Sequence, residues 1–208
     1  AKNPSFPKET NEQISRFEKA VFLLNNAGFT PLRHACATSG TFLFPSAHFD
    51  MVRIGIGLYG LWPSKETEAA YEKSISLKPA LLWKTIVGEV KTFPRGSGIG
   101  YDFTETLPPY SKIAICPIGY WHGYPRSLSS IGRVIVRGKS AKIVGRVSMD
   151  MIVIDISRIE GVRVGDEAVL IGHDCKVEIS ADTLATLSDT TNYEIVTRIN
   201  PLIKRIYM

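Results

Sequence analysis

The chain has 208 residues, of which 44% are hydrophobic and 22% charged, a composition typical of a globular protein with one or two domains. Its formal net charge of +5 comes from Lys and Arg residues spread along the whole length, which is only a weak signal for nucleic-acid binding and is more typical of a solvated surface. Three cysteines without metal-like spacing, and the lack of an apolar run long enough for a membrane span, favour a cytoplasmic protein without structural disulfides or a zinc site.

The N-terminal third alternates between helix and strand patterns. Apolar residues recur at helical spacing over residues 10–28, and short buried strands are expected over residues 31–38 and 49–53. Such alternation is typical of a parallel α/β barrel, but two strands cannot close one. We therefore expect residues 1–62 to be the C-terminal end of an incomplete α/β barrel, in a chain that is a piece of something longer, and residues 63–75 to be a polar linker.

The rest of the chain, residues 76–208, contains short segments rich in β-branched residues and separated by turn residues. These segments span residues 76–93, 112–118, 133–137, 141–146, 151–156 and 167–171. Their close spacing favours a small, closed or nearly closed β-barrel-like domain, and Ser180 is expected to cap a helix that ends at Leu187. The predicted fold class is thus mainly β: a C-terminal β domain preceded by the last βα units of a TIM-type α/β barrel.

Tyr101 lies between a glycine-rich turn and an acidic residue, in the stretch SGIGYDF. Gly96, Gly98 and Gly100 follow a strand-like segment, so the backbone there can turn sharply or approach another surface closely. A loop with a packed aromatic is the simpler interpretation, and a phenol aimed by the turn is the functional one. Tyr101 is our candidate for the chemical centre.

Arg53 ends a short strand and is followed by Gly55 and Gly57. Backbone N–H groups that are free at such a place suit an anion, and phosphate is the anion we expect. Thr38, just after the other short strand, offers a hydroxyl to the same site. A buried arginine paired with a carboxylate, beside two packing glycines, is the structural alternative.

Four further stretches carry unusual information. They are VRIGIGLYG (residues 52–60), PIGYWHGYPRSL (117–128), VGRVSMDMIVIDI (144–156) and TNYEIVTRI (191–199). Together with the Tyr101 stretch, and in this order, they resemble the alanine racemases, pyridoxal-phosphate (PLP) enzymes built from an eight-stranded α/β barrel and a C-terminal β domain. The resemblance implies an isomerase that interconverts L-alanine and D-alanine for peptidoglycan precursors.

The resemblance also implies roles for the residues of the phosphate site. It assigns Thr38, Gly55, Ile56 and Tyr193 to the PLP phosphate and Arg53 to the pyridine nitrogen. Because a guanidinium is permanently charged, an arginine there discourages protonation of that nitrogen and weakens the ring as an electron sink.

On the substrate side, the resemblance makes Tyr101 one of two catalytic bases. The resemblance also implies that the backbone N–H of Met149 holds the substrate carboxylate and that Tyr120 lies at the entrance to the site. Trp121 and His122 stand where the family usually has alanine and aspartate, a departure that concerns substrate entry.

The family's other base is the lysine that forms the Schiff base with PLP, and this chain has no lysine in the corresponding context. Lys84, in LLWKTIV, is expected at the exposed edge of a β strand. We therefore expect a fragment that is inactive alone and that belongs to a homodimer with shared active sites, without nucleic-acid or membrane partners. Two alternatives stay open: a noncatalytic β-barrel binding module, and a related PLP barrel enzyme acting on another amino acid.

Overall fold

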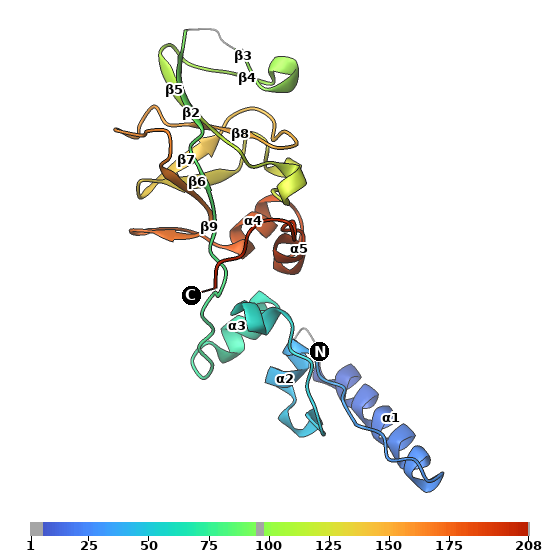
Figure 1. Cartoon of the computed structure of the whole chain (residues 1–208). Helices are drawn as coiled ribbons and strands as arrows, with labels where there is room; N and C mark the ends of the chain where they lie inside the picture. Colours follow the sequence, from blue (N-terminus) through green and yellow to red (C-terminus); the bar gives the residue numbers. More distant parts are fainter. Residues whose placement is uncertain (1–5, 95–97, 208) are drawn as a thin grey trace. The chain divides into compact units, whose positions relative to one another are not determined.

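The computed structural model describes residues 6–94 and 98–207 of the chain, which forms two compact units, Ala1–Ala80 (unit 1) and Leu81–Met208 (unit 2) (Figure 1). Gly96 and Ser97, which precede Tyr101, lie outside the described residues. Unit 1 is mainly helical and unit 2 is mainly β. None of the helices in the described part of the chain is both long and apolar enough to cross a membrane.

Unit 1 consists of helices joined by extended segments. Its longest helix, α1 (Pro7–Asn26), begins with a proline. Proline has no N–H, but the first turn of a helix leaves its N–H groups unpaired in any case, so nothing is lost there. The helix ends before Gly28, whose φ is +86°. This confirms the helix predicted over residues 10–28. The other helices of unit 1 are short: α2 (Thr38–Leu43), η1 (Pro45–Ala47), η2 (Ile56–Tyr59) and α3 (Lys65–Tyr71).

The barrel strands predicted over residues 31–38 and 49–53 do not form. Across the described residues, pairing between the two segments amounts to one parallel bridge, Ala37 with Arg53, and the Arg53 N–H donates to the Cys36 carbonyl at 2.9 Å. The prediction is wrong because the apolar pattern is local, whereas a parallel strand also needs neighbours along its length. Side chains join the segments instead, since Arg33 donates from Nε and Nη2 to the Asp50 carboxylate at 2.9 and 2.8 Å.

Residues 63–75, predicted to be a polar linker, contain helix α3. Ser64 caps this helix by accepting a hydrogen bond from the Thr67 N–H at 3.2 Å, and Glu66 and Glu68 lie in the first turn, where negative charge is favourable. The polar composition of this segment is thus that of a capped, largely exposed helix. The proposed domain boundaries at residues 62 and 76 stay a prediction.

The described residues of unit 2 contain ten strands, eight of which form one antiparallel sheet. Its order is β1-β9-β6-β7-β8-β5-β2, β10 pairs with β9, and β3 and β4 form a separate hairpin. The strands are β1 (Trp83–Ile86), β2 (Glu89–Phe93), β3 (Gly98–Ile99), β4 (Glu105–Thr106), β5 (Ser111–Cys116), β6 (Arg133–Val136), β7 (Lys139–Ile143), β8 (Ile152–Asp155), β9 (Glu167–Asp174) and β10 (Val177–Ile179). The sequence missed β3, β4 and β10, which are too short to show an alternating pattern.

The sheet curls on itself. β1 and β2 lie at opposite ends of the strand order, although Val87 and Gly88 alone separate them in sequence. At this corner the Val87 N–H donates to the Asp166 carbonyl beside β9, and the Gly88 N–H donates to the Ile115 carbonyl in β5, both at 2.8 Å. The corner therefore joins the two edges of the sheet, which confirms the predicted barrel-like β domain.

Apolar side chains of the strands fill the curled sheet, in β6 and β9 from consecutive positions, and two helices cover one end of it. Helices α4 (Ala181–Leu187) and α5 (Asn192–Thr197) contribute the fully buried Leu184 and Ile195 to this core. As predicted, Ser180 caps α4 by accepting from the Thr183 N–H at 3.0 Å. Figure 1 shows α4 and α5 at the opposite end of unit 2 from the β3–β4 hairpin.

Candidate active site

In unit 1, the buried hydroxyl of Thr38 forms hydrogen bonds with the backbone that follows Arg53 and enters helix η2. Its Oγ1 accepts from the Gly55 N–H at 3.1 Å and from the Gly57 N–H at 3.4 Å. A Cβ on Gly57 would lie 2.9 Å from the Thr38 methyl group, so this contact needs a glycine, whereas a Cβ on Gly55 would meet nothing within 4 Å. Ile56 between them is buried. The structure thus brings together three of the predicted phosphate ligands, with open space beside Gly55.

Arg53 lies next to this group but is exposed. Its Nη2 donates to the Ala35 carbonyl at 3.3 Å. Burial raises the pKa of the neighbouring Cys36 thiol, and the positive charge of Arg53 partly offsets that rise. The carboxylate of Asp50 pairs with Arg33, so a buried Arg53 paired with a carboxylate is not what the structure shows.

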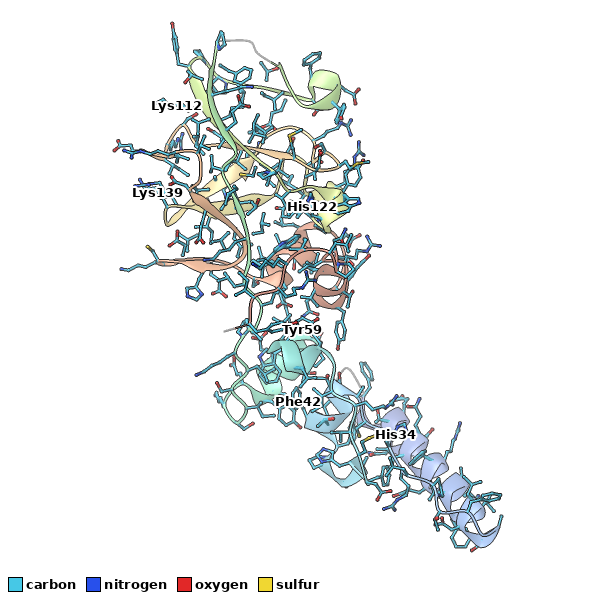
Figure 2. All side chains as sticks on the ribbon, in the orientation of Figure 1. His34, Phe42, Tyr59, Lys112, His122 and Lys139 are labelled. Atoms are coloured by element: carbon cyan, nitrogen blue, oxygen red, sulfur yellow. The ribbon has the colours of Figure 1, made fainter. Side chains whose placement is uncertain are left out.

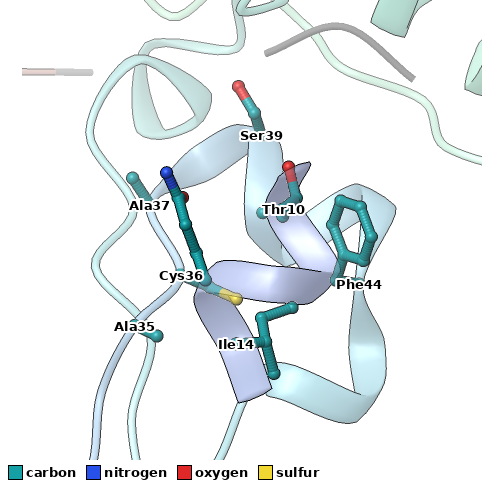
Figure 3. Close-up of a pocket in the computed structure, with 9 residues that line it drawn as sticks. Thr10, Ile14, Ala35, Cys36, Ala37, Ser39 and Phe44 are labelled. Carbon is teal, nitrogen blue, oxygen red and sulfur yellow. The ribbon is translucent and has the colours of Figure 1, made fainter. Parts of the chain in front are cut away.

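A cavity of about 280 Å³ lies nearby in unit 1, between α1 and residues 35–44 (Figure 3). Ile14, Ala35 and Phe44 give it an apolar wall, and the Cys36 thiol donates to the Ala47 carbonyl at 3.2 Å. None of the residues predicted to bind the cofactor lines this cavity. The candidate phosphate site is therefore the surface formed by Thr38 and Gly55.

In unit 2, Tyr101 is two-thirds exposed, at 66%, and begins the short helix η3 (Tyr101–Phe103) in the connection between β3 and β4. Gly100 before it has a φ of +74°, and a Cβ there would lie 2.9 Å from the Arg146 backbone nitrogen. Both features require a glycine, as the sequence indicated. Asp102 has a φ of +62° and pairs with Arg146 at 3.4 Å. The turn therefore presents the Tyr101 phenol from a backbone held against residues 145 and 146.

Tyr120 and Met149 also lie together in unit 2. The Tyr120 N–H donates to the Ser148 carbonyl at 3.0 Å, and the Trp121 N–H donates to the Met149 carbonyl at 2.9 Å. A Cβ on Gly119 would lie 2.3 Å from the Ser148 oxygen, so this approach needs a glycine. Both predicted substrate residues, Tyr120 and Met149, are about half exposed.

The remaining tyrosines differ in their surroundings. Tyr124, in the same motif as Tyr120, is a fully buried core residue that packs against Trp83. Burial raises the pKa of its phenol. Tyr193 is half-buried in the first turn of α5, and burial raises the pKa of its phenol. Because Tyr193 belongs to unit 2, its grouping with Thr38 stays a prediction.

Glu105, at the start of β4, is a residue that the sequence did not single out. Its carboxylate accepts from the Lys142 ammonium at 2.6 Å and from the Gly145 N–H at 2.9 Å. Its partners lie 37 and 40 residues away, so no local pattern could have revealed it.

No group of three or more His, Cys, Asp or Glu side chains suited to a metal ion occurs within the ranges 6–94 and 98–207. The three cysteines are free thiols, with Cys36 and Cys116 buried and Cys175 exposed. Figure 2 shows His122, which belongs to the Tyr120 segment, on the opposite side of unit 2 from Lys112 and Lys139.

Two family models match the chain and together span nearly all of it. "Alanine racemase, C-terminal domain" matches residues 80–207, and "Alanine racemase, N-terminal domain" matches residues 1–63. The chain belongs to the alanine racemase family. The motifs that carry the resemblance in the sequence, around Arg53, Tyr101, Tyr120, Met149 and Tyr193, all fall within these matches.

Curated alanine racemases resemble the chain over most of its length. The protein from Leptospira interrogans is 46% identical over 199 residues, which cover 93% of this chain and 51% of that protein. The protein from Halothermothrix orenii is 45% identical, over 95% of this chain and 52% of that protein. The chain therefore spans about half the length of the curated racemases it matches.

Solved alanine racemases have the same fold. The Bacillus anthracis enzyme with bound L-Ala-P is 36% identical, with a TM-score of 0.85 over 92% of this chain and 48% of that chain. The Bartonella henselae enzyme with covalently bound pyridoxal phosphate is 29% identical, with a TM-score of 0.83 over 100% of this chain and 54% of that chain. These matches confirm the predicted fold class, the end of an α/β barrel followed by a β domain.

Proposed function

We propose that this chain forms the C-terminal half of an alanine racemase, which interconverts L-alanine and D-alanine with PLP as cofactor. The observation that carries the proposal is the family match together with the grouping of Tyr120 and Met149, next to the backbone segment that holds the Tyr101 turn. D-Alanine made in this way would serve peptidoglycan synthesis in the cytoplasm. The free thiols Cys36, Cys116 and Cys175 are compatible with that reducing compartment.

The surroundings of Thr38 fit the phosphate of PLP. Thr38 Oγ1 holds the Gly55 and Gly57 N–H groups, its own O–H can donate to an anion, and the open space beside Gly55 provides room for one. Tyr193 would complete this set, and Arg53 would face the pyridine nitrogen. When bound, PLP would stabilise the negative charge that develops at the substrate α-carbon once its proton has left.

The residues of unit 2 would hold the substrate and move one proton. The Met149 N–H would hold the substrate carboxylate, in a backbone anchored through the Met149 carbonyl to the Trp121 N–H. Tyr101 would take up or return the α-proton on one face of the substrate, and a lysine outside this chain would serve the other face. This chain alone would then lack one of the two bases and would not racemise alanine.

A homodimer is part of the proposal, in which Tyr101, Tyr120 and Met149 serve the active site of the partner chain. Thr38, Arg53 and Tyr193 would serve the site of their own chain. This arrangement gives each site one proton-transfer residue from each chain. The exposure of Tyr101 and Met149, at 66% and 55%, is what a surface that contributes to a shared site requires.

The test uses the product of the intact gene, supplied with PLP. We expect this product to racemise alanine and the 208-residue chain alone not to do so. Tyr101→Phe should slow solvent deuterium incorporation by more than ~10²-fold from one alanine enantiomer and leave the other exchanging, because a general base contributes on the order of 10²- to 10⁴-fold. The matched control is Tyr110→Phe, the same change at a tyrosine that is 82% exposed, which should leave both rates unchanged. Equal loss from both enantiomers in Tyr101→Phe would contradict a face-specific base.

A further inference from the structure

The hairpin that carries Tyr101 is too short to fix its own geometry. Its strands β3 and β4 have two residues each, with Gly98 paired to Thr106 and Ile99 to Glu105. Isolated two-stranded hairpins are marginally stable in water even when they are longer than this. The position of Tyr101 must therefore depend on contacts between the hairpin and the curled sheet.

One such contact is apolar and lies under β3. Ile99 is buried in a cluster with Leu107, Ile113 and Val144. Its carbonyl oxygen would be 2.9 Å from a Cβ on Gly145, so the absence of a side chain at Gly145 allows the hairpin to approach. Apolar packing of this kind stabilises the hairpin but is not directional, so it does not by itself fix the orientation of the turn.

The directional contact comes from Glu105, which is paired with Ile99 across the hairpin. Its Oε1 accepts from Lys142 Nζ at 2.6 Å and its Oε2 accepts from the Gly145 N–H at 2.9 Å. The Glu105 side chain is 21% exposed and that of Lys142 is 41% exposed. Each carboxylate oxygen thus has its own donor, one from β7 and one from the segment that leads to Met149.

The charge of Glu105 is stabilised where it lies. Burial would raise the pKa of its carboxyl group, but hydrogen bonds from Lys142, Gly145 and Ser130 outweigh burial, so the pKa lies below its ordinary value. Both partners of the two oxygens are donors, so an amide at this position would place its NH₂ group against another donor. A glutamine of the same size therefore cannot replace both contacts.

Gly145 lies at the start of the segment that carries the rest of the site. A Cβ on Gly100, the residue before Tyr101, would lie 2.9 Å from the Arg146 nitrogen, and the Ser148 and Met149 carbonyls accept from Tyr120 and Trp121. The other link, from Asp102 to Arg146 at 3.4 Å, is weaker because the Asp102 side chain is 75% exposed.

We propose that Glu105 is a positioning residue: its carboxylate, held by Lys142 and the Gly145 N–H, fixes the Tyr101 turn relative to the Gly145–Met149 segment. Glu105 touches neither substrate nor cofactor and acts through Tyr101. The proposal rests on the proposed function, since it concerns the geometry between the second base and the residue that holds the substrate carboxylate.

The first arm of the test is hydrogen exchange in the 208-residue chain itself. Glu105→Gln should raise exchange at the Gly145 amide and in residues 98–106 by about 10-fold or more, because one of the two donors, Lys142 or the Gly145 N–H, loses its acceptor and the hairpin opens locally. Lys142→Met, a second variant that leaves Glu105 intact, should give a smaller increase in the same residues, and Lys142→Arg should restore protection. The matched control is Glu167→Gln, which removes a carboxylate paired with Lys84 at a similar distance, 2.7 Å, and should leave residues 98–106 unchanged.

The second arm uses the PLP-loaded product of the intact gene. Glu105→Gln should lower kcat by about 10-fold or more, should change KM for alanine by less than about 3-fold, and should slow deuterium incorporation from the same enantiomer that Tyr101→Phe affects. Replacing a residue with a merely structural role would slow deuterium incorporation from both enantiomers equally.

The outcomes separate the two proposals. Unchanged protection of both Gly145 and residues 98–106 in Glu105→Gln, or equal slowing of deuterium incorporation from both enantiomers, would overturn the role of Glu105. If the wild-type gene product racemises nothing, the proposed function is wrong, and the exchange of Gly145 still decides whether Glu105 fixes the hairpin.

Discussion

Gly119 lies against Met149 so closely that a Cβ at position 119 would be 2.6 Å from the Met149 carbonyl carbon and oxygen. The contact is between two backbones, so neither side has a flexible side chain that can move away. It sets the distance between the segment that carries Tyr120 and the segment that carries Met149.

Gly119→Ala should therefore separate these two segments. The added methyl group would break the hydrogen bonds from the Tyr120 and Trp121 N–H groups, and we expect a loss on the order of 2–4 kcal/mol in the stability of unit 2. Denaturant unfolding of the 208-residue chain measures this loss. Gly88→Ala is the matched control, because its Cβ would lie 3.4 Å from the nearest atom, and it should cost less than about 1 kcal/mol. Similar losses in both variants would count against the contact.

The ion pair of Arg33 and Asp50 predicts an acid dependence in unit 1. Hydrogen bonds from Arg33 lower the pKa of Asp50 to about 2 in the folded chain, below the value of about 3.9 for an unfolded aspartate. Because the folded pKa is the lower one, the pair contributes stability above about pH 4 that is lost as the pH falls through about 2.

Asp50→Asn should remove this acid dependence. Hydrogen exchange of residues 33–53 at several pH values, normalised to the intrinsic rates, measures it. We expect protection in the wild-type chain to fall between about pH 4 and pH 2, and protection in the variant to be lower at neutral pH and flat through that range. Glu12→Gln, at an exposed carboxylate on α1, is the control and should keep the wild-type profile. An unchanged profile in Asp50→Asn would show that the pair has no role there.

The sequence predicts the β domain better than it predicts unit 1. In β5 and β8 short runs of apolar, largely β-branched residues mark the strands directly, and Ile113 and Ile154 within them are buried. Residues 31–38 have a similar local pattern, but whether they form a strand depends on neighbours, which a local pattern does not report. Within the part of the chain that the structure describes, the β pairing of residues 31–38 with residues 49–53 consists of one bridge, Ala37 with Arg53.

The candidate site shows the same division. The glycine-rich turn pointed to Tyr101, because a sharp turn or close backbone approach leaves a signature such as Gly100, whereas Tyr120 and Met149 were predicted from the resemblance to the alanine racemases. The carboxylate of Glu105 leaves none, since its contacts are made across the fold. Motifs therefore supply candidates for ligand contact, which stay predictions, and the structure adds a residue, Glu105, that contacts the segments carrying them.

Thr38 should be required for its hydroxyl. Thr38→Val keeps the size of the side chain and removes the acceptor of the Gly55 and Gly57 N–H groups, so we expect PLP affinity of the gene product to fall by about 10- to 100-fold. Thr38→Ser retains the hydroxyl and should stay within about 3-fold of the wild type. Titration of the product of the intact gene with PLP, followed by absorbance, measures both. Equal affinities in all three proteins would exclude Thr38 from the phosphate site.

Shared active sites predict complementation between inactive variants. A gene product with Tyr101→Phe and one that lacks the cofactor lysine should each be inactive, and mixing them should restore part of the racemase activity, because each mixed dimer contains one intact site. Subunit exchange is verified with differently tagged chains. If exchange occurs and no activity returns, both bases come from one chain.

Trp121 should restrict which amino acids reach the site. Its backbone is held on both sides, by the Met149 carbonyl at its N–H and by Asn200 Nδ2 at its carbonyl, both at 2.9 Å. The indole is 49% exposed and stands edge-on to the His122 ring, with centroids 5.0 Å apart. A large, anchored aromatic therefore stands beside the two residues proposed to meet the substrate.

Trp121→Ala leaves the backbone contacts intact and removes the bulk alone. We expect kcat/KM for alanine to stay within about 3-fold of the wild type and that for amino acids with longer side chains to rise by about 10-fold or more, since one methylene of pocket space is worth roughly 10- to 200-fold in discrimination. Ile131→Ala, at an apolar residue that is also 49% exposed and makes none of these contacts, is the matched control and should change neither value. If the wild-type protein already prefers a longer amino acid to alanine, Trp121 does not exclude such substrates, and the alternative of a related PLP enzyme acting on another amino acid would replace alanine racemisation.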